Sequence, residues 1–109
     1  MKIEEITFEE LLHLKKYEPV TLIDVRTREE YEKEHLEGAE NICKEDIKSI
    51  PGEFDEIIVY LKKCQAEGKK IVLYCQSGSR SMRCAMLLKE YGINCMSLMD
   101  GIDGINNMN

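Results

Sequence analysis

Two periods in the hydrophobic pattern predict a chain that alternates between strands and helices. Short strand-like segments fall at residues 3–6, 20–24, 40–43, 71–74 and 93–98. Residues 20–24 are almost continuously apolar, which suits a parallel strand covered on both faces. The alternation of these segments with helical patterns predicts an α/β fold. We expect a mainly parallel sheet of about five strands in three layers, with helices on both faces.

Capping residues mark where two of the helices begin. Thr7 is followed three residues later by Glu10, and Thr27 by Glu30. In this capping box each side chain bonds the backbone N–H of the other residue. The pattern predicts one helix that ends by residues 17–19 and a short one that ends near residue 34.

Two further helices are predicted by apolar residues at helical spacing. The first carries Phe54, Ile57, Ile58, Leu61 and Cys64 and is closed by Gly68. The second spans residues 80–90 and ends before Gly92. This second helix is apolar around much of its circumference, so we expect it to be the most buried, with methionines as core filler.

The remaining segments carry weaker patterns. Residues 44–49 are polar and predict irregular structure with at most one helical turn. Gly101 and Gly104 predict a turn, followed by a short tail at residues 105–109.

Composition narrows the classes of function. A chain of 109 residues predicts one domain over residues 1–109. A net charge of −6 argues against a nucleic-acid or anionic-membrane partner. No apolar stretch approaches the roughly 18 residues needed to span a bilayer. The first residues are acidic and lack an apolar signal region, so we expect a cytoplasmic protein.

Cysteine usage argues against a structural role for disulfides or metals. The chain has five cysteines, an odd number, and none has Cys-x-x-Cys spacing. This excludes the usual patterns of a disulfide framework, a zinc ribbon and a thioredoxin motif. Apart from Cys75, the simplest interpretation is small buried hydrophobic residues, although Cys43 and Cys84 could also approach the loop described next.

Candidate chemistry is concentrated in one loop. Cys75 follows the strand at residues 71–74 and precedes the helix that begins near Arg80. A helix start and a tight Ser/Gly loop both present unpaired backbone N–H groups, which bind anions. A thiol placed there is expected to react as the thiolate, with Arg80 adding a fixed positive charge. We therefore predict Cys75 as the catalytic nucleophile.

Neighbouring residues complete the predicted site. The substrate-binding residues are expected to be those of the loop, namely Gln76, Ser77, Gly78, Ser79, Arg80 and Ser81. Asp24 and Arg26 lie at the carboxyl end of the strand at residues 20–24, the edge where sites gather in open α/β sheets. They either stabilise their own turn or support the loop.

The loop resembles the active-site loop of the rhodanese family of sulfurtransferases, with the pattern Cys-x-x-Gly-x-Arg. Further blocks resemble that family in the same order: Asp24-Val25-Arg26, Glu30-Tyr31, residues 35–42 and residues 98–101. The match extends over roughly residues 3–104. Departures occur at four positions, which are Glu34, Glu37, Asp100 and Ile105.

The resemblance implies a two-step sulfur transfer. Cys75 would take a sulfane sulfur from a donor and hold it as a persulfide, and a thiophilic acceptor would remove it. Implied donors are thiosulfate, a small persulfide or a persulfide-carrying protein, and implied acceptors are cyanide or a thiol. Neither a cofactor nor a metal ion is required. The resemblance also implies that Asp24 and Arg26 brace the loop, that His35 is a structural turn residue, and that the family's final helix is largely missing.

Two alternatives stay open on the same fold. A phosphatase or arsenate reductase of the Cdc25 type also has a Cys loop that ends in Arg, but with five intervening residues. Here only four residues separate Cys75 from Arg80, a ring that suits one sulfur atom better than a tetrahedral oxyanion. A non-catalytic interaction module is the other alternative, although the chain keeps both Cys75 and Arg80.

Overall fold

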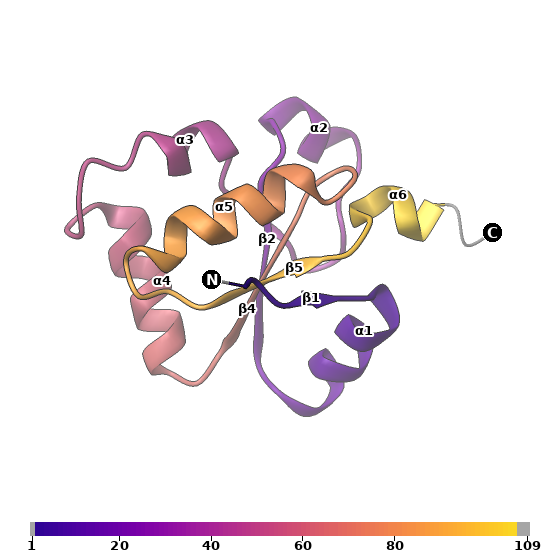
Figure 1. Cartoon of the computed structure of the whole chain (residues 1–109). Helices are drawn as coiled ribbons and strands as arrows, with labels where there is room; N and C mark the ends of the chain where they lie inside the picture. Colours follow the sequence, from indigo (N-terminus) through magenta and orange to yellow (C-terminus); the bar gives the residue numbers. More distant parts are fainter. Residues whose placement is uncertain (1, 107–109) are drawn as a thin grey trace.

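The structure is a computed structural model that describes residues 2–106, and it is built around a single parallel sheet (Figure 1). The strands are β1 (Glu5–Ile6), β2 (Val20–Asp24), β3 (Glu40–Asn41), β4 (Lys70–Tyr74) and β5 (Cys95–Leu98). They lie in the order β1-β5-β4-β2-β3, and every neighbouring pair is parallel. The predicted α/β fold is therefore confirmed, with β1 and β3 shorter than expected.

Helices cover both faces of this sheet, as predicted. The six helices of the described residues are α1 (Phe8–Tyr17), α2 (Arg28–Lys33), α3 (Lys44–Lys48), α4 (Glu56–Ala66), α5 (Ser79–Lys89) and α6 (Gly101–Asn106). The buried residues of α3, α4 and α5 belong to one apolar cluster, and those of α1 and α6 to the other. The fold thus has three layers, with α3, α4 and α5 on one side of the sheet (Figure 1).

The central strand β4 distributes its side chains between these two clusters. Ile71, Leu73 and the following Cys75 belong to the cluster with α5, whereas Val72 and Tyr74 belong to the cluster with α1. This alternation is the period of a strand. It points Cys75 toward the start of α5.

Local capping residues fix three helix starts. Both predicted capping boxes are present, with Thr7 and Glu10 at α1 and with Thr27 and Glu30 at α2. At α4 the prediction was wrong by two residues. The Asp55 carboxylate accepts the Ile57 N–H at 2.9 Å and begins the helix, so Phe54 precedes it and is 87% exposed.

The C-terminal prediction was wrong. Residues 101–106 form α6 rather than a turn and tail, and Ile102 is buried in the cluster with α1. Asp100 adopts a positive φ of 61°, which turns the chain after β5 so that α6 packs back on the sheet. The predicted tail at 107–109 lies outside the described residues.

The methionine prediction was also wrong in part. Met82 packs against the core, but Met86 is 54% exposed on α5. Four residues of α5 are fully buried, so the helix presents one apolar face rather than an apolar circumference.

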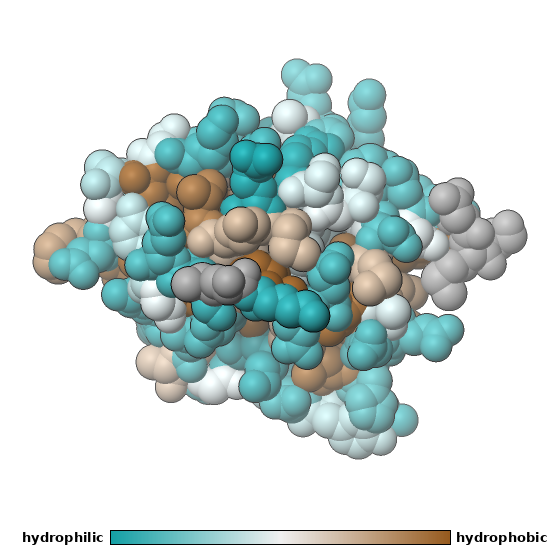
Figure 2. All heavy atoms as spheres, viewed as in Figure 1, coloured by the Kyte–Doolittle hydropathy of each residue, from teal (hydrophilic) through white to brown (hydrophobic). Residues whose placement is uncertain are grey.

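Figure 2 shows the mainly hydrophilic surface of one side of the molecule, with hydrophobic residues in small groups. In residues 2–106 no helix is long and apolar enough to cross a bilayer.

Candidate active site

The Cys75 sulfur lies at the junction of β4 and α5, surrounded by hydrogen-bond donors. Gly78 takes a φ of 107° and caps α5, which turns its N–H toward Cys75 Sγ at 3.1 Å. The Ser81 N–H donates to the same sulfur at 3.4 Å, whereas Ser81 Oγ, 3.6 Å away, accepts from the thiol. Together with the start of α5, these dipoles stabilise negative charge on the sulfur.

The thiol is nevertheless enclosed. Cys75 is 0% exposed, whereas Ser77 and Ser79 of the loop are exposed. The surface over Cys75 is therefore formed by the loop itself. Ser81 contributes its backbone N–H only, because its hydroxyl is buried and lies 2.7 Å from Ser97 Oγ.

Asp24 and Arg26 form a buried ion pair beside the loop. Arg26 Nη2 lies 2.8 Å from Asp24 Oδ2, and the two residues are 2% and 0% exposed. Arg26 Nη1 donates to Gln76 Oε1 at 3.1 Å, and Arg26 Nη2 donates to the Glu34 carbonyl at 2.7 Å. The pair thus lies in direct contact with the loop, as the bracing role requires. It also stabilises its own turn, because Asp24 accepts the Arg26 backbone N–H at 2.8 Å.

Gln76 connects this pair to the C-terminal helix. Its Nε2 donates to Asp103 Oδ1 while its Oε1 accepts from Arg26. The backbone makes the same connection, since the Ile102 N–H donates to the Cys75 carbonyl at 3.0 Å and the Asp103 N–H to the Gln76 carbonyl at 2.9 Å. These two bonds anchor the first residues of the loop to α6. The start of α6 is a part of the site that the sequence interpretation missed.

Arg80 contacts a carboxylate of α2. Its guanidinium is bidentate with Glu30, with Nη1 to Oε1 at 2.8 Å and Nη2 to Oε2 at 3.1 Å. The hydrogen bond from Arg80 lowers the pKa of Glu30 from its ordinary value of 4.5 to about 2. Glu30 is a second missed site residue. It was recognised as a capping residue and as part of the family pattern, but not as the partner of Arg80, because their contact spans 50 positions of sequence.

The other cysteines differ from Cys75 in their surroundings. Burial raises the pKa of Cys84 and of Cys95 to about 12, so both are thiols at neutral pH. Cys64 is buried as expected, whereas Cys43 is only half-buried and lies 3.7 Å from Asn41 Oδ1. His35 is exposed and stacks on Tyr31, with ring centroids 3.9 Å apart. This geometry fits a structural turn residue.

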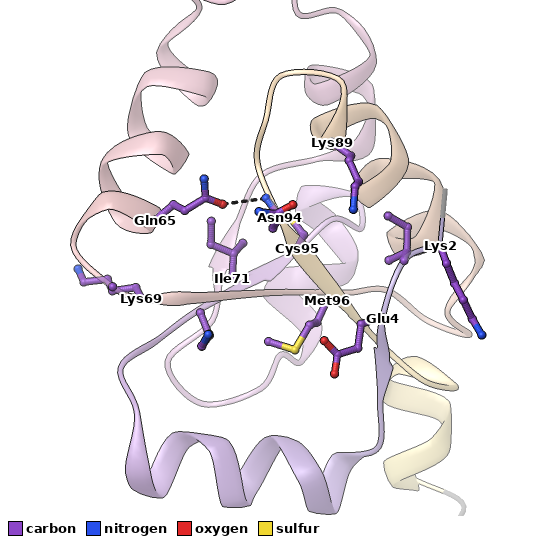
Figure 3. Close-up of a pocket in the computed structure, with 12 residues that line it drawn as sticks. Lys2, Glu4, Gln65, Lys69, Ile71, Lys89, Asn94, Cys95 and Met96 are labelled. Atoms are coloured by element: carbon purple, nitrogen blue, oxygen red, sulfur yellow. Dashed lines mark hydrogen bonds between the residues drawn. The ribbon is translucent and has the colours of Figure 1, made fainter.

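A hollow of about 390 Å³ lies at the opposite, amino-terminal edge of the sheet (Figure 3). Lys2 and Lys69 extend to opposite sides of it, and the Asn94 N–H donates across it to Gln65 Oε1 at 2.8 Å. Its cysteine, Cys95, is 6% exposed and is a thiol at neutral pH.

Between residues 2 and 106, no cluster of three or more His, Cys, Asp or Glu side chains could hold a metal ion. We therefore place the candidate site at Cys75.

The Rhodanese-like domain family model matches residues 7–108. This chain belongs to the rhodanese-like domain family. The human single-domain sulfurtransferase is 26% identical, with a TM-score of 0.67 over 92% of this chain and 91% of that one. Among curated protein sequences, none matches this chain.

Two further solved structures share the rhodanese-like fold at lower identity. A rhodanese-related protein of Thermoplasma volcanium is 21% identical, with a TM-score of 0.74 over 97% of this chain and 93% of that one. A Rhodopseudomonas palustris protein of unknown function, called a possible tyrosine phosphatase, is 24% identical, with a TM-score of 0.77 over 97% of this chain and 81% of that one. Both show the fold alone.

We predict that Gly101→Ala destabilises the domain and disturbs the active loop. Gly101 has a φ of 55°, and an added Cβ would overlap the Cys75 carbonyl and lie 2.6 Å from the Gln76 carbonyl oxygen. The left-handed conformation alone costs a non-glycine residue about 1–2 kcal/mol. Urea unfolding measures the loss. The control is Gly52→Ala, where nothing lies within 4 Å of the added Cβ, and equal effects of the two substitutions would contradict the packing described here.

We predict that the Glu30–Arg80 pair contributes to stability in a pH-dependent way. A carboxyl whose pKa is lowered by folding stabilises the native state above its unfolded value, and that contribution is lost as the pH falls toward the folded value. The advantage of wild type over Glu30→Gln should therefore be full above pH 4.5 and shrink toward about pH 2. Denaturant unfolding at several pH values tests this. Glu32→Gln, whose side chain is 64% exposed, should show a much weaker dependence.

Proposed function

We propose that this rhodanese-like domain is a sulfurtransferase that carries a sulfane sulfur on Cys75. The observation that supports it best is the pair of backbone N–H groups, from Gly78 and Ser81, that bond the Cys75 sulfur at the end of β4. A family whose members include a human single-domain sulfurtransferase is consistent with this chemistry.

In the first step the Cys75 thiolate attacks the outer sulfur of the donor. With thiosulfate, a bond forms between Sγ and that sulfur while the sulfur–sulfur bond of thiosulfate breaks. The bonding electron pair leaves with sulfite, and Cys75 becomes a persulfide anion. No proton is needed on the leaving group, so the step requires no general base.

In the second step a thiophilic acceptor attacks the outer sulfur of the persulfide. Cyanide becomes thiocyanate, the sulfur–sulfur bond breaks, and its electron pair returns to Sγ as the thiolate. The negative charge stays on sulfur throughout. It lies on the outer sulfur in the persulfide and returns to Sγ in the second step. The amides of Gly78 and Ser81 already bond Sγ, so they stabilise the returning charge without reorganisation.

The other site residues support this loop. The Asp24–Arg26 pair holds Gln76 through the hydrogen bond from Arg26 Nη1. Ser77 and Ser79 are exposed, and we propose that the donor arrives over them. We propose thiosulfate, a small persulfide or a persulfide-carrying protein as donor, and cyanide or a thiol as acceptor.

Phosphate-ester hydrolysis is the second candidate, favoured by the fold shared with the protein called a possible tyrosine phosphatase. The loop argues against it, because four residues separate Cys75 from Arg80 and the Arg80 guanidinium is bound to Glu30. A phosphatase loop uses its amides and its arginine together to surround a tetrahedral anion. A non-catalytic module would not need N–H groups directed at the Cys75 sulfur.

We predict that Cys75→Ser abolishes transfer of sulfur from thiosulfate to cyanide, because a serine hydroxyl there has no adjacent base to activate it. Thiocyanate formation and the intact mass after donor treatment are the measurements. Wild type should gain the mass of one sulfur atom, and the variant should not. The control is Cys43→Ser, which changes a half-buried cysteine and should retain transfer.

Several outcomes would contradict the proposal. Transfer by Cys75→Ser would move the nucleophile to another cysteine. Faster hydrolysis of an aryl phosphate than sulfur transfer by wild type would favour the phosphatase. Absence of a persulfide with every donor class would favour the non-catalytic module.

A further inference from the structure

Positive charge beside the active loop is already bound to carboxylates. Arg80 is held by Glu30, with contacts at 2.8 and 3.1 Å, and Arg26 by Asp24 at 2.8 Å. A third carboxylate, that of Asp103, contacts Gln76. The site thus contains three carboxylates, from Asp24, Glu30 and Asp103, and two guanidinium groups, from Arg26 and Arg80.

Glu30 is itself fixed in place. It occupies the third position of α2, and its Oε1 accepts the backbone N–H and the hydroxyl of Thr27, both at 3.1 Å. Because the capping box holds this carboxylate, Arg80 can turn toward an incoming anion only by giving up its bidentate contact. The Arg80 and Glu30 side chains are 30% and 33% exposed, so the pair is accessible from solvent.

Because both arginines are bound to carboxylates, we expect the charge of a sulfur donor to affect how well it binds. Thiosulfate is a dianion, and it would profit most from a free guanidinium beside Cys75. Methanethiosulfonate carries the same sulfane sulfur, but a methyl group replaces one charged oxygen, so it is a monoanion. Small persulfides without an oxyanion group carry still less charge in their neutral form.

We propose that Glu30 is a specificity-determining residue that disfavours dianionic sulfur donors by occupying both Nη groups of Arg80. The inference rests on the sulfur transfer proposed above and extends it to the class of donor. Donors of low charge, such as small thiol persulfides, are then the preferred substrates, and thiosulfate is a poor one.

The decisive variant is Glu30→Gln. Glutamine keeps the length of the side chain and can still close the capping box, but it removes the charge that holds Arg80. We expect KM for thiosulfate to fall by about fivefold, the order of an exposed ion pair, with kcat changed by less than about twofold. KM for methanethiosulfonate should fall by a clearly smaller factor.

Glu32→Gln is the matched control. It makes the same change of charge on α2, but Glu32 is paired with Arg28 at 3.6 Å rather than with Arg80. It should leave both KM values near those of wild type. Equal effects of the two substitutions, or equal effects of Glu30→Gln on both donors, would overturn the proposal.

A binding measurement separates this inference from the proposed function. Calorimetry gives the affinity of the Cys75→Ser variant for thiosulfate, with and without Glu30→Gln. Tighter binding with Glu30→Gln supports the role of Glu30 even if wild type transfers no sulfur, an outcome that would defeat only the proposed function. Equal affinity overturns the role of Glu30 whether or not sulfur is transferred.

Discussion

The buried ion pair of Asp24 and Arg26 is the interaction on which the site depends. Both residues lie at the carboxyl end of β2 and are almost entirely removed from water. Burial of two charges is costly unless every hydrogen-bonding group is satisfied. Arg26 meets this condition by binding Asp24, the Gln76 side chain and the Glu34 carbonyl, which ties the end of α2 to the active loop. The polar network thus fixes the position of the loop that holds Cys75.

Local signals in the sequence were sufficient for much of this arrangement. Thr27 and Glu30 predict the start of α2 because a capping box is a contact between residues three positions apart. The position of Cys75 follows in the same way from the end of an apolar strand and a Gly-containing loop. The family resemblance then placed Asp24 and Arg26 beside that loop, where the structure has Arg26 in contact with Gln76.

The parts that escaped prediction depend on residues distant in sequence. The contact between Gln76 and Asp103 spans 27 positions, and no local pattern around Asp103 predicts it. Two glycines at the end of the chain favour a turn, yet α6 forms there because its first N–H groups bind the carbonyls of Cys75 and Gln76. The prediction for Phe54 was wrong because a local signal was overlooked. Its spacing matched the helical period, but Asp55 caps α4, and the helix begins after Phe54.

The enclosure of Cys75 connects this architecture to its chemistry. A sulfur with no exposed surface, bonded by two backbone N–H groups, has little room around it for three further oxygens. The space that a reaction needs is smallest when only one atom is added, as in formation of a persulfide. The loop from Cys75 to Arg80 is held at this size by the Asp24–Arg26 pair and by the amides of α6. The same supports leave the loop arginine bound to a carboxylate, which suits the proposed chemistry on sulfur better than the binding of an oxyanion.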